Sequence, residues 1–377
     1  MIKVEEFREF LEENNVDFYT GVPDSQLKAF CDYIEEEYST KDKHIIAPNE
    51  GNAVALASGH HLSTGKLALV YMQNSGLGNA VNPITSLTHP DVYNIPVIYL
   101  IGWRGQPNTK DEPQHKKQGK ITTQLLELLD IDYQLLDEDT TIDDVRKVFN
   151  ERFAKKLGKG ESIAYLVAKN AFNPHPRKHK NENTLTREES IQHVVDYLDD
   201  EDMIISTTGK TSRELYEYRE KLGQGHSNDF LTVGSMGHAS TIALAVAKEN
   251  PDKRILCFDG DGAVLMHMAS LAMIGSMKQE NYYHIVFNNK AHESVGGLPT
   301  IIDDIKLDKI ALNCGYKHAY TACNIQELDT TIPEFLSKTG PSLLIVKVNI
   351  ESRPDLGRPT TTPTENKKAF MKKLGGK

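Results

Sequence analysis

An acidic glycine turn lies between a predicted buried strand and a predicted helix in the second half of the chain. The strand is the apolar run 254–258, the turn is Asp259-Gly260-Asp261-Gly262, and the helix covers 263–277. Glycines let the backbone approach an anion, and a helix N-terminus offers free N–H groups and a favourable dipole. A carboxylate at this place would repel phosphates unless a divalent cation lay between them. Asp261 therefore predicts a Mg²⁺ or Ca²⁺ ion.

A pair of asparagines completes this pattern. Residues 284–287 predict a second strand, and Asn288-Asn289 follow it directly. Because ligands in open parallel sheets bind at the carboxyl ends of strands, either amide oxygen can share the cation with Asp261. Turn capping is the alternative role for one of the pair. Together the two segments predict a cofactor that carries a diphosphate and is held through a metal ion.

Strand and helix signals alternate along the chain, which favours parallel sheets covered on both faces. A length of 377 residues fits two domains. We predict an α/β protein with two doubly wound, mostly parallel-sheet domains at 1–170 and 187–377, the second with a C-terminal tail. The segment 171–186, rich in Asn, Pro, His and Lys, is the predicted linker. The strands are predicted at 16–19, 44–47, 67–72, 95–101, 162–168, 203–206, 230–233, 254–258, 284–287 and 342–348.

Charge and composition exclude several classes of protein. The net charge of −10 argues against a nucleic-acid surface, because binders of the phosphate backbone need a basic face. The N-terminus is polar and no apolar run reaches about 18 residues, so we predict neither a secretion signal nor a membrane span. Cys31, Cys257, Cys314 and Cys323 lack CxxC spacing and are expected to be reduced thiols of a cytoplasmic protein.

Three segments, in the same order, resemble the signature of thiamine-diphosphate enzymes. Gly260-Asp261-Gly262 is separated from Asn288-Asn289 by 25 residues. The segment 48–53 (Pro-Asn-Glu-Gly-Asn-Ala) resembles the one that carries the family's cofactor-activating glutamate, and 234–237 (Gly-Ser-Met-Gly) resembles the loop that supports the bent cofactor. The runs 288–300 and 21–25 (Gly-Val-Pro-Asp-Ser) are similar to those of phosphonopyruvate decarboxylases and of their sulfopyruvate-decarboxylating relatives.

The resemblance covers nearly the whole chain and implies a function. It implies a pyrimidine-binding domain, then a diphosphate- and metal-binding domain, without the middle domain of larger members. Thiamine diphosphate and Mg²⁺ would be the cofactors, bound between subunits of a homodimer or larger homo-oligomer. The enzyme would be a lyase that converts 3-phosphonopyruvate to phosphonoacetaldehyde and carbon dioxide, in phosphonate biosynthesis of the 2-aminoethylphosphonate type. Sulfopyruvate or another 2-oxo acid is the alternative substrate, and a non-catalytic paralogue is the remote alternative.

The resemblance also assigns roles to single residues. Glu50 would drive the tautomeric switch of the aminopyrimidine, and it should be poorly solvated for this purpose. Met236 would support the cofactor rings, and Asp261, Asn289 and the Ala291 carbonyl would hold the metal. On composition alone, a solvated first-turn residue is the favoured role of Glu50, and a gap-filler is the usual role of a methionine such as Met236. The presence of the other two motifs reverses this preference. The predicted cofactor-binding residues are Glu50, Asn74, Gly234, Ser235, Met236, Gly260, Asp261, Gly262 and Asn289, with residues 76–79 lining the pyrimidine pocket.

The substrate residues are predicted from charge and position. The polar loop 103–120 follows an apolar strand and carries Arg104 and His115, and such loops are often functional. By resemblance, Ser25 faces the reacting carbon, although it is equally a cap for a helix starting at Gln26. The catalytic candidates are Glu50, Ser25, His115 and His292, with Glu293 as the alternative to His292 for protonating the product carbon. The candidate cations for the phosphonate are Arg104, Arg353 and Arg358.

Two rival functions fail on spacing. Residues 208–212 (Thr-Gly-Lys-Thr-Ser) resemble the end of a P-loop, but Ile204 stands where its first glycine belongs. We therefore expect Lys210 and Thr211 to begin a helix near the diphosphate instead. A dehydrogenase would need Gly-x-Gly-x-x-Gly after a strand, and Ala263-Val264-Leu265 follow Gly262 here.

Overall fold

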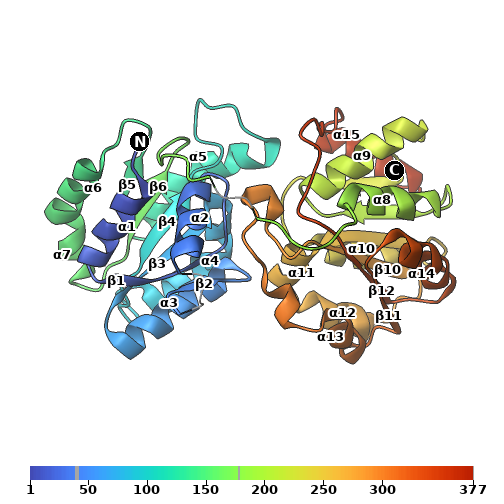
Figure 1. Cartoon of the computed structure of the whole chain (residues 1–377), viewed down its shortest axis with the longest axis horizontal. Helices are drawn as coiled ribbons and strands as arrows, with labels where there is room; N and C mark the ends of the chain where they lie inside the picture. The colour runs from blue at the N-terminus through green and yellow to red at the C-terminus, as the bar shows by residue number, and fades with distance from the viewer. Residues whose placement is uncertain (39–41, 177–178, 377) are drawn as a thin grey trace. The chain divides into compact units, whose positions relative to one another are not determined.

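The computed structural model describes residues 1–38, 42–176 and 179–376. They form two compact units, Met1–Lys178 and His179–Lys377, each with a parallel sheet flanked by helices (Figure 1). Arg177 and Lys178 of the predicted linker, and Lys377 of the predicted second domain, lie outside the described residues. Between β6 (Ile163–Val167) and α8 (Arg187–Asp196) the described residues contain no helix or strand, so no third domain separates the units.

Unit 1 is built on a six-stranded sheet with the order β2-β1-β3-β4-β6-β5. Its strands are β1 (Val16–Gly21), β2 (His44–Ile46), β3 (Leu67–Gln73), β4 (Ile98–Gly102), β5 (Asp132–Leu136) and β6 (Ile163–Val167). Its helices are α1 (Val4–Glu13), α2 (Lys28–Glu37), α3 (Glu50–Thr64), η1 (Asn74–Gly76), α4 (Leu77–Pro83), η2 (Ile84–Thr88), α5 (Pro113–Leu128), α6 (Ile142–Val148), η3 (Phe149–Phe153) and α7 (Ala154–Leu157). β4 and β6 are buried at every position, as expected for apolar strands covered on both faces.

Unit 2 repeats this architecture with the strand order β11-β12-β10-β9-β7-β8. Its strands are β7 (Met203–Ser206), β8 (Asp229–Leu231), β9 (Ile255–Gly260), β10 (Tyr282–Asn288), β11 (His318–Ala322) and β12 (Ser342–Lys347). Its helices are α8 (Arg187–Asp196), α9 (Lys210–Leu222), α10 (Ala239–Glu249), α11 (Asp261–Met266), α12 (Ser270–Met277), η4 (Glu293–Val295), η5 (Ile301–Asp304), α13 (Leu307–Cys314), α14 (Ile325–Ser337) and α15 (Pro363–Lys373).

Alternate residues of β9 pack into two separate cores. Leu256 and Phe258 join a cluster with α8, α9 and α14, whereas Ile255 and Cys257 join one with α10, α12 and α13. Side chains of a strand point alternately to the two faces of its sheet, so both faces are covered by helices. Within the described residues, the neighbouring strands of both sheets pair in parallel, and the predicted architecture of two doubly wound α/β domains is confirmed.

The helix predicted over 263–277 is interrupted. α11 begins at Asp261 and ends at Met266, and α12 begins at Ser270. His267 breaks the helix with φ −133° and ψ 46°, and its ring packs against that of His238 with centroids 4.3 Å apart. The tertiary contact of His267 therefore overrides the helical propensity of the apolar run.

Two further sequence predictions concern disulfides and membranes. All four cysteines are free thiols, as expected from their spacing. Among the described residues, none of the helices combines the length and apolarity that crossing a bilayer requires.

Candidate functional site

The glycine turn and the paired asparagines meet at the carboxyl edge of the second sheet. β9 and β10 pair so that Phe287 lies opposite Gly260. Asn288, the last residue of β10, and Asn289, which follows it, therefore reach the sheet edge from which Asp261 begins α11. Asp261 is 3% exposed and accepts a 2.6 Å hydrogen bond from Thr300 Oγ1. Burial raises the pKa of Asp261 to about 7. A divalent cation would offset this burial, since it supplies the positive charge that the carboxylate needs.

Each asparagine of the pair caps the turn that follows it. Asn288 Oδ1 accepts from the Lys290 N–H at 3.0 Å, and Asn289 Oδ1 accepts from the Ala291 N–H at 3.1 Å. An amide oxygen has two lone pairs, so either oxygen retains capacity for a metal ion. Asn289 differs because its Nδ2 donates to Glu293 Oε2 at 2.9 Å. The metal roles of Asn289 and of the buried Ala291 remain predictions.

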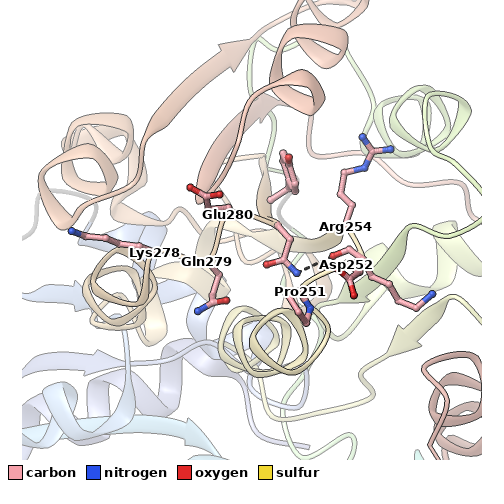
Figure 2. A pocket seen from close by; sticks show the side chains of 9 residues that line it. Pro251, Asp252, Arg254, Lys278, Gln279 and Glu280 are labelled. Carbon is pink, nitrogen blue, oxygen red and sulfur yellow. Dashed lines mark hydrogen bonds between the residues drawn. The ribbon is translucent and has the colours of Figure 1, made fainter.

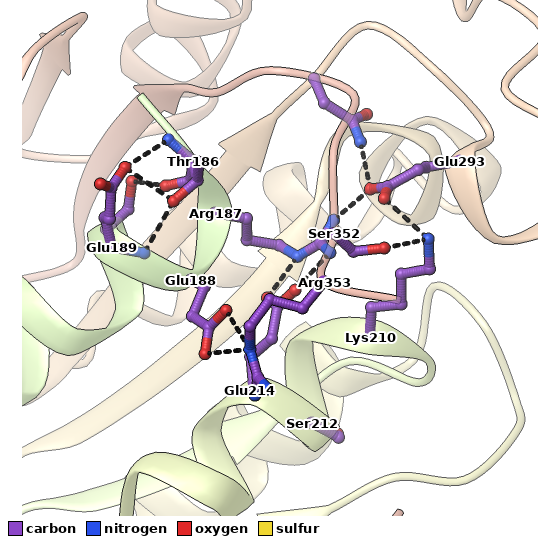
Figure 3. Close-up of polar contacts among 12 residues, drawn as sticks. Thr186, Arg187, Glu188, Glu189, Lys210, Ser212, Glu214, Glu293, Ser352 and Arg353 are labelled. Carbon is purple, nitrogen blue, oxygen red and sulfur yellow. Dashed lines mark hydrogen bonds and ion pairs between the residues drawn. The ribbon is translucent and has the colours of Figure 1, made fainter. Parts of the chain in front are cut away.

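Glu293 belongs to a buried chain of charges, shown in Figure 3. Its carboxylate accepts from Arg187 and from Lys210 Nζ, and Arg187 also forms a double hydrogen bond with Glu214. Burial alone would raise the pKa of Glu293, but Arg187 and Lys210 outweigh it and hold that pKa below its usual range. An ionised carboxylate with both oxygens engaged is poorly suited to donate a proton, so His292 is the better candidate of the two.

His292 lies close to Gly262 of the glycine turn and to the loop that follows β8. A Cβ atom on Gly262 would stand 3.2 Å from the His292 ring and 3.3 Å from Met236 Cε. Burial lowers the pKa of His292 to about 4, so the imidazole is neutral at pH 7. The loop itself is sharply bent, because Ser235 and Gly237 have φ of +56° and +86°. The structure therefore brings Met236, Gly262 and His292 together.

The residues around the turn fit a diphosphate. A Cβ atom on Gly209 or on Gly260 would meet nothing within 4 Å, so both backbones border open space. Thr207 is buried at the end of β7, and its Oγ1 has no hydrogen-bond partner within the described part of the chain. α9 begins directly after this segment, at Lys210, as the sequence predicts. An unpaired hydroxyl, exposed glycine backbone and a helix N-terminus are groups that bind phosphate oxygens.

Glu50 occupies the first turn of α3 in unit 1. Its side chain is buried at 5% exposure, although first-turn acids are usually solvated. Asn79 Nδ2 donates to Glu50 Oε2 at 2.8 Å, and a Cβ atom on Gly76 would overlap the Glu50 carboxyl group. The carboxyl group is therefore fixed between α3 and α4. Gly76 and Asn79, which support this carboxyl group, belong to the segment 76–79, which was predicted only to line the pyrimidine pocket.

Three predicted substrate residues converge in the same unit. Arg104 Nη1 donates to Ser25 Oγ at 2.8 Å, and Arg104 and His115 both bind Asp111, a residue for which no role was predicted from the sequence. The alternative role of Ser25 as a helix cap is wrong, because α2 begins at Lys28 with Leu27 at its N-cap.

Asn74 supports the loop that carries Arg104. Its amide donates to the Arg104 carbonyl and to Thr122 Oγ1, both at 2.8 Å, and accepts from the Arg104 N–H at 3.2 Å. These bonds engage the side chain within unit 1. Contact of Asn74 with the cofactor remains a prediction.

The two C-terminal arginines lie on the segment between β12 and α15. Arg353 pairs with Glu188 at 2.8 Å and also with Glu217, which ties this segment to α8 and α9. A phosphonate would have to compete with two carboxylates for Arg353. Arg358 is exposed. Substrate binding by Arg353 and Arg358 remains a prediction.

A surface pocket of about 460 Å³ lies at the opposite edge of the second sheet (Figure 2). It is lined by residues 251–254 and 278–281 and by Tyr283, at the amino ends of β9 and β10. Two of its three cations already have acidic partners, since Arg254 pairs with Asp202 and Lys253 with Glu201. Ligands of parallel sheets bind at the carboxyl ends of strands, so this pocket is not the candidate site.

Comparisons with known proteins cover both units. Residues 4–126 match the family "thiamine pyrophosphate enzyme, N-terminal TPP binding domain", and residues 207–346 match the corresponding C-terminal TPP binding domain. A phosphonopyruvate decarboxylase of Streptomyces viridochromogenes is 33% identical, with 93% of this chain and 89% of the relative covered. One of Streptomyces hygroscopicus is 33% identical, covering 93% and 88%. A sulfopyruvate decarboxylase of Methanosarcina acetivorans is 26% identical, covering 82% of each.

Proposed function

This chain belongs to the phosphonopyruvate decarboxylase family of thiamine pyrophosphate enzymes, and we propose that its substrate is 3-phosphonopyruvate. The chain is a thiamine-diphosphate-dependent decarboxylase. In the proposed reaction, which requires Mg²⁺, the products are phosphonoacetaldehyde and carbon dioxide. The proposed setting is the biosynthesis of phosphonates of the 2-aminoethylphosphonate type.

Each part of the proposed site has a defined task. When bound, thiamine diphosphate supplies a nucleophilic carbon and accepts the electron pair that departing carbon dioxide leaves behind. Glu50, buried and oriented by Asn79, would bind the aminopyrimidine ring and exchange a proton with it. Asp261 and Asn289, with the Ala291 carbonyl, would hold the Mg²⁺ ion that accompanies the diphosphate. His292 stands beside the glycine turn to exchange a proton with the product.

The observation that carries the substrate assignment is the extent of similarity to two phosphonopyruvate decarboxylases. Identity is 33% over 93% of the chain for both, against 26% over 82% for the sulfopyruvate decarboxylase. Sulfopyruvate remains the second candidate, because a sulfonate has nearly the size and shape of a phosphonate with one negative charge fewer.

Turnover of three 2-oxo acids tests the assignment. Purified protein with thiamine diphosphate and Mg²⁺ is given phosphonopyruvate, sulfopyruvate or pyruvate, and carbon dioxide release is measured. We expect the highest kcat/KM for phosphonopyruvate. A higher value for sulfopyruvate would transfer the assignment to that acid. Cofactor binding without release from any of the three would support a non-catalytic paralogue.

Replacing Glu293 with glutamine is expected to weaken Mg²⁺ binding. The change replaces one carboxylate oxygen with an NH₂ group, so a single oxygen is left for the donors of Asn289, Arg187 and Lys210, and the orientation of the Asn289 amide is disturbed. Arg187 keeps its paired hydrogen bonds with Glu214. Loss of an outer support typically costs about 10- to 100-fold in metal affinity. Thiamine diphosphate binding is titrated against Mg²⁺, with the exposed Glu280→Gln variant as control. An unchanged Mg²⁺ requirement in the Glu293→Gln variant would show that Asn289 does not bind the metal.

We also propose a homodimer or larger homo-oligomer in which unit 1 of one subunit and unit 2 of its partner share each cofactor. Glu50→Gln and Asp261→Ala should then complement each other, because a mixed dimer has one intact site and one doubly damaged site. Random pairing makes about half of the dimers mixed, and each mixed dimer has one intact site of two. Co-expression is therefore expected to restore about one quarter of wild-type turnover. Each variant alone serves as the control. Absence of any recovery in isolated mixed dimers would place both residues in a site within one subunit.

A further inference from the structure

We propose that Asp111 is a positioning residue that presents Arg104 and His115 to the oxo-acid end of the substrate. The inference rests on the proposed function. Asp111 accepts five hydrogen bonds in unit 1. Oδ1 accepts from Arg104 Nη2 at 2.6 Å, His115 Nδ1 at 2.8 Å and the Glu112 N–H at 2.8 Å. Oδ2 accepts from Arg104 Nε at 2.9 Å and the Gly105 N–H at 2.7 Å.

Asp111 is a fixed negative charge. Its side chain is largely buried, and burial alone would raise its pKa, but Arg104 and His115 outweigh this effect and hold the pKa well below the usual range. An ionised carboxylate is a pure acceptor, so the proton of a neutral His115 ring resides on Nδ1. His115 Nε2 is then the ring nitrogen left for substrate. One acid thereby sets both the tautomer of the imidazole and the plane of the guanidinium group.

The backbone holds this arrangement closely. Gly105 has φ of +67°, and a Cβ atom on it would overlap the His115 carbonyl group. A Cβ atom on Gly119 would in turn overlap the Gly105 backbone. The start of the loop and the helix α5 therefore touch backbone to backbone, which requires glycine at both places. The predicted loop 103–120 is a loop only as far as Glu112, because α5 begins at Pro113. The lysines of this segment are all exposed, namely Lys110, Lys116, Lys117 and Lys120.

The charge of the cluster indicates which end of the substrate it binds. Asp111 offsets the charge of Arg104, so the pair offers little net attraction for a doubly charged phosphonate. Its donors, together with Ser25 Oγ, suit the carboxylate and keto oxygens that all 2-oxo acids share. We therefore infer that the cluster acts at the reacting end and does not discriminate phosphonopyruvate from pyruvate.

A double-mutant cycle tests this role. Asp111→Asn is expected to lower kcat/KM about 100-fold, as for loss of a positioned proton-transfer group. Because Asp111 acts through His115, the Asp111→Asn/His115→Gln double variant should be little worse than the poorer single variant. The affinity for thiamine diphosphate with Mg²⁺ and the ratio of kcat/KM values for phosphonopyruvate and pyruvate should stay unchanged. The exposed Lys116→Gln variant serves as the control and should match the wild type.

Three results would overturn the proposal: additive losses, a changed substrate ratio, or a fully active Asp111→Asn variant. A second measurement is independent of turnover. ¹⁵N shifts of the His115 imidazole should show the proton on Nδ1 in the wild type and a mixture of tautomers in Asp111→Ala. If no 2-oxo acid is turned over but the tautomer responds in this way, the proposed function fails while the positioning by Asp111 stands. A wild-type imidazole with the proton on Nε2 would overturn the positioning itself.

Discussion

The Glu50→Gln variant is expected to bind thiamine diphosphate and Mg²⁺ normally and to lose about 10²- to 10⁴-fold in turnover. The Glu50 carboxyl group is buried and receives a hydrogen bond from Asn79. Glutamine reproduces its shape, but an amide cannot take up and return the proton that shifts the aminopyrimidine between tautomers. Steady-state release of carbon dioxide and a cofactor titration separate the two effects. Undiminished decarboxylation by Glu50→Gln would refute the assigned role.

A pair of glycine variants provides a geometric check on Glu50. Gly76 has helical φ and ψ of −70° and −18°, so alanine suits its backbone, but the new Cβ atom would overlap the Glu50 carboxyl group. Gly59 lies within α3, and a Cβ atom there would meet nothing within 4 Å. Gly76→Ala should therefore lose turnover, by up to about 100-fold for a displaced catalytic group, whereas Gly59→Ala should match the wild type. Equal activity would show that the position of Glu50 is not critical.

The sequence predicted the interior of both sheets better than their edges. Fully buried strands such as β6 and β7 are short apolar runs, and the predicted bounds of β7 are those observed. β5 (Asp132–Leu136) and β11 (His318–Ala322) were not predicted. Each lies at the edge of its sheet and is mostly half-buried, so its composition is mixed and its apolar pattern is weak. Edge strands are held by pairing with a neighbour, which the local sequence does not reveal.

The candidate site divides in the same way. The metal turn could be predicted because its residues follow adjacent strands, so their sequence positions determine their meeting point. The supports of these residues could not be predicted. Arg187 and Glu293 are separated by 106 positions, and Asn79 and Glu50 by 29. Asp111 belongs to a loop with several charges, and only tertiary packing decides which of them turn inward. A sequence pattern thus identifies the residues that bind a ligand more easily than it identifies the residues that orient those ligand-binding side chains.

The Asp261→Ala variant is expected to lose Mg²⁺-dependent retention of thiamine diphosphate. A direct metal ligand should cost more than the roughly 10- to 100-fold that an outer support costs. Without a cation, burial raises the pKa of Asp261 from its ordinary value of 3.8 to about 7. Ionisation of this group therefore lowers the free energy of unfolding progressively as the pH rises above 3.8. Removing the carboxyl group with Asp261→Asn should therefore leave the metal-free protein at least as stable at pH 7, which separates loss of binding from unfolding.

Calorimetric titration of thiamine diphosphate with Mg²⁺, and again with a chelator, measures this loss. Asp303→Asn provides the control, because Asp303 is half-exposed and pairs with Lys290 in the segment that follows the asparagine pair. We expect wild-type and Asp303→Asn proteins to lose affinity when the metal is chelated, and Asp261→Ala to bind weakly in both conditions. If Asp261→Ala instead kept both its affinity and its dependence on Mg²⁺, the cation would have to be held by other groups, and the glycine turn would serve the diphosphate through its backbone alone.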